Sequence, residues 1–189
     1  KVMNDMYTGS FYGFFSTGTF AFSEPGQVDI KYTNMDAIHS LDFIGINYYG
    51  NNYVKFDFQS KSHFKFITRE GDIQTDMGWP IYAEGIYRAI KYASELQLPI
   101  YITENGIPDR KDTNRELFIK RYLYAVSKAI KYGYNVKGYM YFSLMDGFHW
   151  QKGYTMKFGL FETDFRTQKR ILRKGSQSFI NIVRKFRRV

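Results

Sequence analysis

The sequence predicts an α/β fold with a parallel sheet, because three short apolar runs alternate with three helical patterns. The apolar runs are rich in β-branched and aromatic residues, as buried strands are. They span residues 41–49, 99–103 and 138–144. Apolar residues at helical spacing follow over residues 82–96, about 113–132 and from about 175 onward. This order predicts parallel strands that are each buried on both faces.

The chain length limits how complete this fold can be. The chain has 189 residues, of which 44% are hydrophobic and 24% charged, as in ordinary globular domains. No repeat, low-complexity stretch or linker divides it, so residues 1–189 are predicted to form one domain, or part of one, without an internal boundary. A complete eight-unit α/β barrel needs about 250 residues, which is more than this chain has.

The elements are expected in a simple order along the chain. The first forty residues predict a helix and a loop, with a turn at Ser23-Glu24-Pro25-Gly26. The two central helices are each expected to pack one apolar face against the sheet. The apolar residues include Ile86, Ala89, Ile90 and Ala93 in the first helix, and Leu117, Tyr124 and Ile130 in the second.

Polar and aromatic residues follow each predicted strand without an evident packing reason. They are Asn47, Tyr48 and Tyr49 after the first strand, Glu104 and Asn105 after the second, and Asp146, His149 and Trp150 after the third. The carboxyl ends of parallel strands meet at one edge of a sheet, where active sites of such folds lie. These residues are therefore the candidates for a functional site.

The most informative stretch is Tyr101-Ile102-Thr103-Glu104-Asn105-Gly106. A carboxylate that follows a β-branched strand and precedes a glycine turn can be aimed at a substrate carbon from a rigid support. Carboxylates in loops and at helix starts are also common, so the spacing alone leaves both interpretations open.

Four motifs in order and spacing resemble glycoside hydrolase family 1, the β-glucosidases, β-galactosidases and their relatives, over nearly the whole chain. The motifs are Leu41 to Tyr49; Met77-Gly78-Trp79 with Glu84 to Tyr87; Tyr101 to Gly106; and Gly138-Tyr139 with Ser143 to Asp146, Phe148 to Trp150, Gly153-Tyr154 and Phe158 to Leu160. The resemblance implies a partial (β/α)8 TIM barrel that contains strands six to eight with their helices.

The resemblance also implies roles for individual residues. Glu104 matches the nucleophile that attacks the anomeric carbon, and Tyr49 matches the residue whose hydroxyl orients it. Asn47 and Trp150 match positions that line the sugar subsite. A retaining mechanism needs a second carboxyl group about 5 Å from the nucleophile, to protonate the leaving oxygen and later activate water.

That second carboxyl group is missing from this chain. The family carries it in a Thr-x-Asn-Glu-Pro motif on strand four, with a His-Trp pair on strand three, and neither occurs here. Glu24-Pro25 is preceded by Ser23 where the family has Asn, and it lies in a predicted turn, so it is not expected to be the acid/base.

Two matched positions depart from the family pattern. Phe142 stands where the family has Trp, and His149 stands where it usually has a Glu that accepts hydrogen bonds from sugar hydroxyls. Both residues are expected to contact substrate, with an altered sugar preference. The phospho-β-glycosidase branch is disfavoured, because its phosphate-binding Ser, Lys and Tyr are replaced by His149, Met156 and Phe158.

Charge and composition limit the partners and cofactors. The net charge is +9, with the excess between Lys169 and Val189, and aromatic residues are 20% of the chain. Arg184, Lys185, Arg187 and Arg188 alternate with apolar residues, as on a solvated helix, and no nucleic-acid recognition motif occurs. No apolar run is long enough to span a membrane. The absence of Cys and of glycosylation sequons favours a cytoplasmic location, and no metal or organic cofactor is expected.

The sequence therefore predicts the nucleophile half of a retaining β-glycosidase that hydrolyses β-linked glucosides or similar O-glycosides. The small-molecule β-glycoside and the missing amino-terminal half of the barrel, in cis or in trans, are the expected partners. The alternative is a catalytically inactive, glycosidase-like scaffold that binds carbohydrate or another protein.

Overall fold

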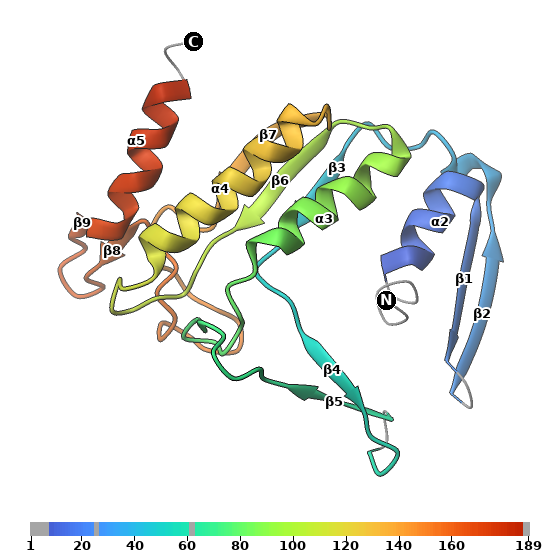
Figure 1. Ribbon diagram of the computed structural model, residues 1–189, viewed down its shortest axis with the longest axis horizontal. Coiled ribbons are helices and arrows are strands. Elements are labelled where there is room, and N and C mark those ends of the chain that lie inside the picture. The colour runs from blue at the N-terminus through green and yellow to red at the C-terminus, as the bar shows by residue number, and fades with distance from the viewer. Residues whose placement is uncertain (1–7, 25–26, 61–62, 187–189) are drawn as a thin grey trace.

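The computed structural model describes residues 8–24, 27–60 and 63–186, with a three-stranded parallel sheet at its centre (Figure 1). The strand order is β3 (Ile44–Asn47), β6 (Ile100–Asn105) and β7 (Val136–Tyr141). All three strands coincide with the predicted apolar runs, and both pairings are parallel. The α/β class predicted from the sequence is confirmed.

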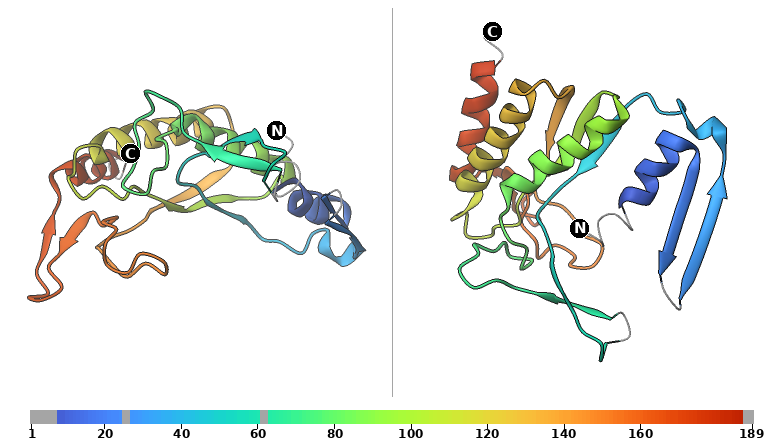
Figure 2. Two further views of the ribbon diagram at one scale, coloured as in Figure 1. Left: turned by 90° about the horizontal axis from the view of Figure 1, so that it is seen from below. Right: turned by 45° about the vertical axis from the view of Figure 1, so that its right-hand side comes forward.

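Three helices flank this sheet. They are α3 (Ala83–Ala93, continued by the 3-10 turn Ser94–Leu96), α4 (Arg115–Lys131) and α5 (Gln177–Phe186, preceded by the 3-10 turn Lys174–Ser176). They lie where helical spacing predicted them, with α3 and α4 side by side over one face of the sheet (Figures 1 and 2). The core forms between these two helices and the sheet. Its fully buried members include Ile86, Ile90, Ile100, Ile102 and Phe118.

The prediction that each strand is buried on both faces is wrong for the two outer strands. All residues of β7 are exposed or half-buried, and only Ile46 is buried in β3. Phe43, Met140 and Leu144, in or beside these strands, are each more than half exposed. The reason is that α3 and α4 cover only one face of the sheet, and no described element packs over the other face in their place.

The predicted apolar face of α4 also needs correction. Tyr124 and Ile130 are exposed and Leu117 is only half-buried. The stripe that packs on the sheet is instead Phe118, Tyr122, Ala125 and Ala129. These residues are spaced four, three and four apart, which keeps them on one side of the helix.

The first forty residues form a helix, as predicted, but a β-hairpin replaces the predicted loop. Helix α2 (Ser10–Thr17) leads into β1 (Thr19–Glu24) and β2 (Val28–Thr33), which pair antiparallel, and a 3-10 turn (Met35–Ala37) follows. Pro25 and Gly26 of the predicted turn lie outside the described residues. The alternation of residue types from Thr19 onward is the period of a strand.

Two further hairpins were not predicted. The first joins β4 (Tyr53–Phe56) to β5 (Phe64–Ile67) and extends from the carboxyl edge of the sheet (Figure 1). The second joins β8 (Phe161–Thr163) to β9 (Arg170–Leu172) ahead of α5. Their strands have three or four residues each, too few for a clear periodic signal.

The loops at the carboxyl edge are tied together by one buried side chain, that of Arg115 at the start of α4. Its guanidinium is fully buried and donates six hydrogen bonds. The acceptors are the Asp112 carboxylate, the Tyr141 hydroxyl and the carbonyls of Ile107, Asp109, Lys157 and Phe158. Burial lowers the pKa of Arg115, but Tyr141 and Asp112 raise it by more, so the side chain stays charged.

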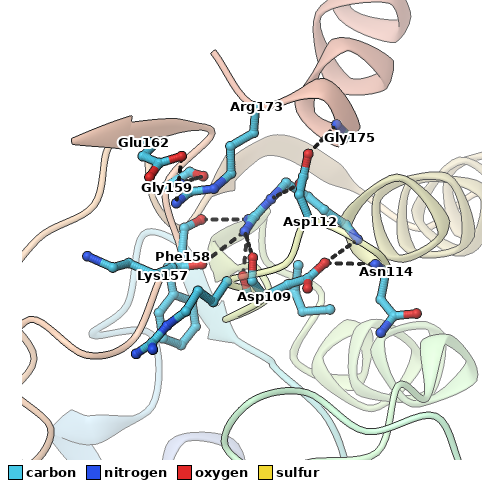
Figure 3. Close-up of polar contacts among 12 residues, drawn as sticks. Asp109, Asp112, Asn114, Lys157, Phe158, Gly159, Glu162, Arg173 and Gly175 are labelled. Atoms are coloured by element: carbon cyan, nitrogen blue, oxygen red, sulfur yellow. Dashed lines mark hydrogen bonds and ion pairs between the residues drawn. The ribbon is translucent and has the colours of Figure 1, made fainter. Parts of the chain in front are cut away.

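Neighbouring carboxylates extend this network to both adjacent helices (Figure 3). Asp109 Oδ2 accepts from the backbone N–H groups of Asn114 and Arg115 and so caps α4. Asp112 Oδ2 accepts from Gly175 N–H at the start of the α5 segment, at 2.7 Å. The loop before α4 is therefore fixed to α4 and to the α5 segment by hydrogen bonds.

A second buried ion pair fixes the loop after β7. Asp146 is 3% exposed, and both of its carboxylate oxygens accept from Arg173 at 3.0 Å. Arg173 also donates to the Gly159 carbonyl, and Asp146 accepts from Gly159 N–H. This bidentate pairing holds the loop against the strand that precedes α5.

Replacing Arg115 by Met is expected to lower the free energy of unfolding by about 3–5 kcal/mol, because it removes the donor from four backbone carbonyls and the cation that pairs with Asp112. Pulse proteolysis in urea measures this change. Arg121→Met, at an exposed position of the same helix, is the matched control and is expected to stay within about 0.5 kcal/mol. Equal effects of the two substitutions would contradict the role given to Arg115.

The 189-residue chain on its own is expected to self-associate, because β3 and β7 each have only β6 as a partner among the described strands. Sedimentation velocity over a range of concentrations measures this association. Met140→Lys, on the uncovered face, should reduce it, whereas Tyr124→Lys on α4 should not. A monomeric chain with one cooperative thermal transition would show that the open sheet is stable alone.

Candidate active site

The candidate site forms where β3 and β6 end together. Asn47 and Glu104 are register partners, the last in the β3–β6 pairing, so both belong to the carboxyl edge. Tyr48 N–H donates to the Glu104 carbonyl at 2.9 Å and extends the pairing by one residue. The nucleophile candidate thus stands on backbone that is held from the neighbouring strand.

Tyr49 reaches Glu104 directly. Its hydroxyl donates a hydrogen bond of 2.5 Å to Glu104 Oε2. Burial raises the pKa of Tyr49 well above its ordinary value, and the hydrogen bond and negative charge of Glu104 raise it further. The phenol therefore remains a donor throughout the physiological pH range, and it fixes the orientation of the carboxylate.

Asn47 is exposed beside this pair, and its side chain is oriented by Thr103. The Thr103 hydroxyl donates to Asn47 Oδ1 at 2.7 Å. Because this bond engages the amide oxygen, the amide NH₂ group is the part of Asn47 suited to meeting an acceptor on a ligand.

Asn105 and Asp146 have structural reasons for their positions, which corrects the interpretation drawn from the sequence. Asn105 is fully buried; its amide donates to the Tyr48 carbonyl at 2.5 Å, and its carbonyl oxygen accepts from the Tyr139 hydroxyl at 2.6 Å. Asn105 therefore braces β3 and β7 from β6. Asp146 forms the buried pair with Arg173.

Tyrosine hydroxyls tie the end of β3 to the helices. Tyr48 donates to the Tyr82 carbonyl at 3.0 Å, and Tyr122 accepts from Tyr82 N–H while donating to the Tyr49 carbonyl at 3.2 Å. Gly85 makes room for this arrangement, since a Cβ there would lie 1.7 Å from the Tyr48 hydroxyl oxygen. Burial raises the pKa values of Tyr48 and Tyr122, so both stay protonated.

An aromatic wall stands beside Glu104. The Tyr49 ring lies 5.5 Å from Trp79 and 5.9 Å from both Phe142 and Phe158, between ring centroids. Phe142 is held by its backbone, because its N–H donates to the Asn105 carbonyl at 2.9 Å. A Cβ at Gly106 would lie 1.6 Å from the Phe142 carbonyl oxygen, so glycine is required for this approach.

His149 belongs to the same wall. Its ring stacks on Phe158, with 4.7 Å between centroids and 13° between planes, and meets Phe142 edge-on at 6.0 Å. Within the described residues, its Nε2 is buried and has no hydrogen-bond partner. The imidazole therefore sits close to the predicted site but packs mainly as a flat ring.

Trp150 is the predicted site residue that stays apart from this cluster. It is 94% exposed, and its indole meets Phe148 edge-on at 6.4 Å. The structure thus brings together Glu104, Tyr49, Phe142 and His149, with Asn47 on the adjoining strand.

Glu24 lies away from this site. It ends β1 in the first hairpin, which stands beyond α2 from the sheet (Figure 1). Its carboxylate accepts from the Gln27 side chain at 3.2 Å. That Glu24 is not the acid/base stays a prediction.

Residues 8–24, 27–60 and 63–186 contain neither a candidate metal site nor a candidate membrane span. No group of three or more His, Asp or Glu side chains there is arranged to hold a metal ion. None of the helices in these ranges is both long and apolar enough to cross a membrane.

The model of glycosyl hydrolase family 1 matches residues 12–187, almost the entire chain. This chain belongs to glycosyl hydrolase family 1. The resemblance carried by the four motifs is confirmed at the level of the family.

Relatives in the family share about a third of their residues with this chain. A β-galactosidase from Pyrococcus woesei is 34% identical over 188 residues, which cover 87% of this chain and 37% of that protein. β-Glucosidase A from Thermotoga maritima is 38% identical over 155 residues, which cover 76% of this chain and 34% of that protein. The chain spans little more than a third of the length of these two glycosyl hydrolases.

A solved family structure confirms the fold. The β-glycosidase from Pyrococcus horikoshii superposes with a TM-score of 0.83 at 33% identity, covering 97% of this chain and 42% of that protein. Such neighbours are TIM-barrel enzymes of glycosyl hydrolase family 1. The described sheet is open, and the chain corresponds to part of such a barrel.

Replacing Glu104 by Gln is expected to lower the pKa of Tyr49, because Gln keeps the size but removes the negative charge that opposes phenolate formation. Burial should still keep this pKa above that of an exposed tyrosine. Tyrosinate absorbance during alkaline titration measures the shift, and a Tyr49→Phe/Glu104→Gln double variant identifies the Tyr49 step. Glu116→Gln, at an exposed position on α4, is the control. An unchanged Tyr49 titration in Glu104→Gln would contradict the pairing.

Proposed function

We propose that this chain supplies the nucleophile half of a retaining β-glycosidase that hydrolyses β-linked glucosides or similar O-glycosides. The observation that carries the proposal is the carboxylate of Glu104 at the end of a parallel strand, held by a 2.5 Å hydrogen bond from Tyr49. In this proposal β3, β6 and β7 are the sixth, seventh and eighth strands of the barrel.

In this reaction Glu104 forms a covalent bond to the sugar. A carboxylate oxygen attacks the anomeric carbon while the glycosidic bond breaks, and the leaving oxygen takes a proton from a second carboxyl group. Water, deprotonated by that group, then displaces Glu104 from the glycosyl-enzyme and restores both residues. The second group belongs about 5 Å from Glu104 and comes from the remaining part of the barrel, in cis or in trans.

Tyr49 assists Glu104 before the attack on the anomeric carbon. Its proton donation stabilises the ionised carboxylate before attack and keeps the free oxygen pointed at the substrate. Because the pKa of Tyr49 is raised, the donor is not lost at neutral or mildly alkaline pH.

The remaining predicted residues set substrate preference. Asn47 can donate to a sugar hydroxyl through its NH₂ group, and Trp150 offers an exposed ring and an N–H once the barrel is complete. Phe142 and His149 provide ring surface where other family members have Trp and Glu. The chemistry proposed uses no metal or organic cofactor.

A catalytically inactive scaffold is the second candidate, and one observation favours it. His149 packs its ring against Phe158 and buries Nε2, whereas a carboxylate at this position would bind sugar hydroxyls. A glycosidase-like surface could in this way retain carbohydrate or protein binding without turnover.

Covalent trapping tests the proposal. When the chain is supplied with an amino-terminal half of the barrel, a 2-fluoro glucoside with a good leaving group should label Glu104, as peptide mass spectrometry would show. Glu104→Gln should remain unlabelled, and Glu24→Gln should label normally. If Glu104 stays unlabelled while Thermotoga maritima β-glucosidase A reacts under the same conditions, the scaffold function is favoured instead.

A further inference from the structure

A shallow groove runs between α3 and α4 and is unrelated to the Glu104 site. Its volume is about 420 Å³, and a second depression of about 440 Å³ adjoins it and shares Tyr124 and Lys128. We call the two depressions together the α3–α4 groove. The residues that matter for its chemistry are Tyr87, Arg88, Arg121, Tyr124, Lys128 and, in the second depression, Lys131 and Tyr132.

The groove presents aromatic rings to solvent. Tyr124 is 70% exposed and Tyr132 is 67% exposed. Lys128 Nζ lies 5.6 Å from the Tyr87 ring centroid and 5.9 Å from that of Tyr132, within range of a cation–π interaction with each. Tyr87 and Tyr132 also meet edge-on at 6.3 Å. Tyr87, Tyr132 and Lys128 therefore form one connected cluster, and Tyr124 lines the groove beside it.

The charge of the groove is positive. Arg88, Arg121, Lys128 and Lys131 line it together with one carboxylate, that of Glu84. Glu84 is already engaged, because it lies 3.4 Å from Arg88 in an ion pair and accepts from the Tyr82 hydroxyl at 3.1 Å. The remaining cations have no acidic neighbour among the groove residues, so an acidic partner complements them.

The strands that complete a barrel close the sheet on the side away from α3 and α4, so they do not occupy this groove. In a (β/α)8 barrel the helices form the outer ring. The floor of the groove includes Ala125 of the core stripe, and its remaining lining includes the exposed side chains of Arg121, Tyr124 and Lys128. Its exposed aromatic rings are therefore not explained by the missing strands, in contrast to Phe43 and Met140 on the open sheet.

The composition favours a protein partner. Tyr and Arg, with Trp, are the residue types most enriched at the energetic centres of protein interfaces, and the rims of such interfaces are polar. A second copy that docked through the same groove is disfavoured as the occupant, because it would bring a second set of the cations Arg88, Arg121, Lys128 and Lys131 against the first. A nucleic acid is disfavoured as the occupant, because phosphate binding favours an uninterrupted basic stripe and Glu84 interrupts the basic residues of this groove.

We infer that the α3–α4 groove docks an acidic peptide segment of a partner protein, with carboxylates on Arg121 and Lys128 and an aromatic side chain against Tyr124. This inference is independent of the proposed glycosidase activity, because the groove shares no residue with the Glu104 site.

The probe is a synthetic twelve-residue peptide of alternating Glu and Phe, and fluorescence anisotropy measures its binding to the protein that carries this chain. Arg121→Glu/Lys128→Glu should weaken binding at least about tenfold, since it reverses charges at the contact. Tyr124→Ala should weaken it about fivefold or more without a change in charge. The matched control is Lys31→Glu/Lys111→Glu, which makes the same change in net charge at exposed positions elsewhere and should leave affinity within about threefold.

Two results would overturn the inference. Equal weakening by the groove and control double variants would show that the peptide responds only to net charge. A single-stranded oligonucleotide that binds more tightly than the peptide, and that is lost in Arg121→Glu/Lys128→Glu, would assign the groove to nucleic acid instead.

Discussion

The buried guanidinium of Arg115 is the constraint on which the carboxyl edge of the sheet depends. It donates to backbone carbonyls on both sides of the candidate site, at Ile107 after β6 and at Phe158 in the loop after β7. A buried charge of this kind is costly unless every donor finds an acceptor, and here the acceptors are the loops themselves. The loops satisfy Arg115 in an arrangement that places Phe158 beside Tyr49.

The site depends on this frame in two steps. Parallel pairing brings Asn47 and Glu104 to the same edge, and the amide of Asn105 holds the neighbouring strands at fixed separation. The aromatic wall then excludes water from one side of the Tyr49–Glu104 pair, which strengthens their hydrogen bond. The pair is thus set in place before any substrate is bound, although it is open on the side where the rest of a family 1 barrel belongs.

Much of this structure could be predicted from the sequence, for identifiable reasons. The strands around Ile46, Ile102 and Tyr139 fall in apolar runs rich in β-branched and aromatic residues. Glu104 and Tyr49 lie in motifs whose order and spacing resemble those of the family. The hairpins were missed because their strands are short, and Arg115 was missed because a lone arginine at a helix start has no sequence feature that separates it from a surface residue. Asn105 was taken for a site residue because buried and catalytic polar groups at a strand end look alike in sequence. Tyr124 was assigned to the core because hydrophobicity does not distinguish a tyrosine that packs inward from one that faces solvent.

The contact between Gly106 and residue 142 has a consequence for how this site can diverge. The close approach is to the carbonyl oxygen of Phe142 and not to its ring, so the ring can be exchanged for another without moving the chain. The same contact leaves position 106 with no alternative to glycine. Substitutions at this edge are therefore limited to side chains. The side chains of the aromatic wall can change and alter which ligands fit, while the backbone that carries them keeps its position. A site built in this way can change its specificity by single substitutions without first losing its fold.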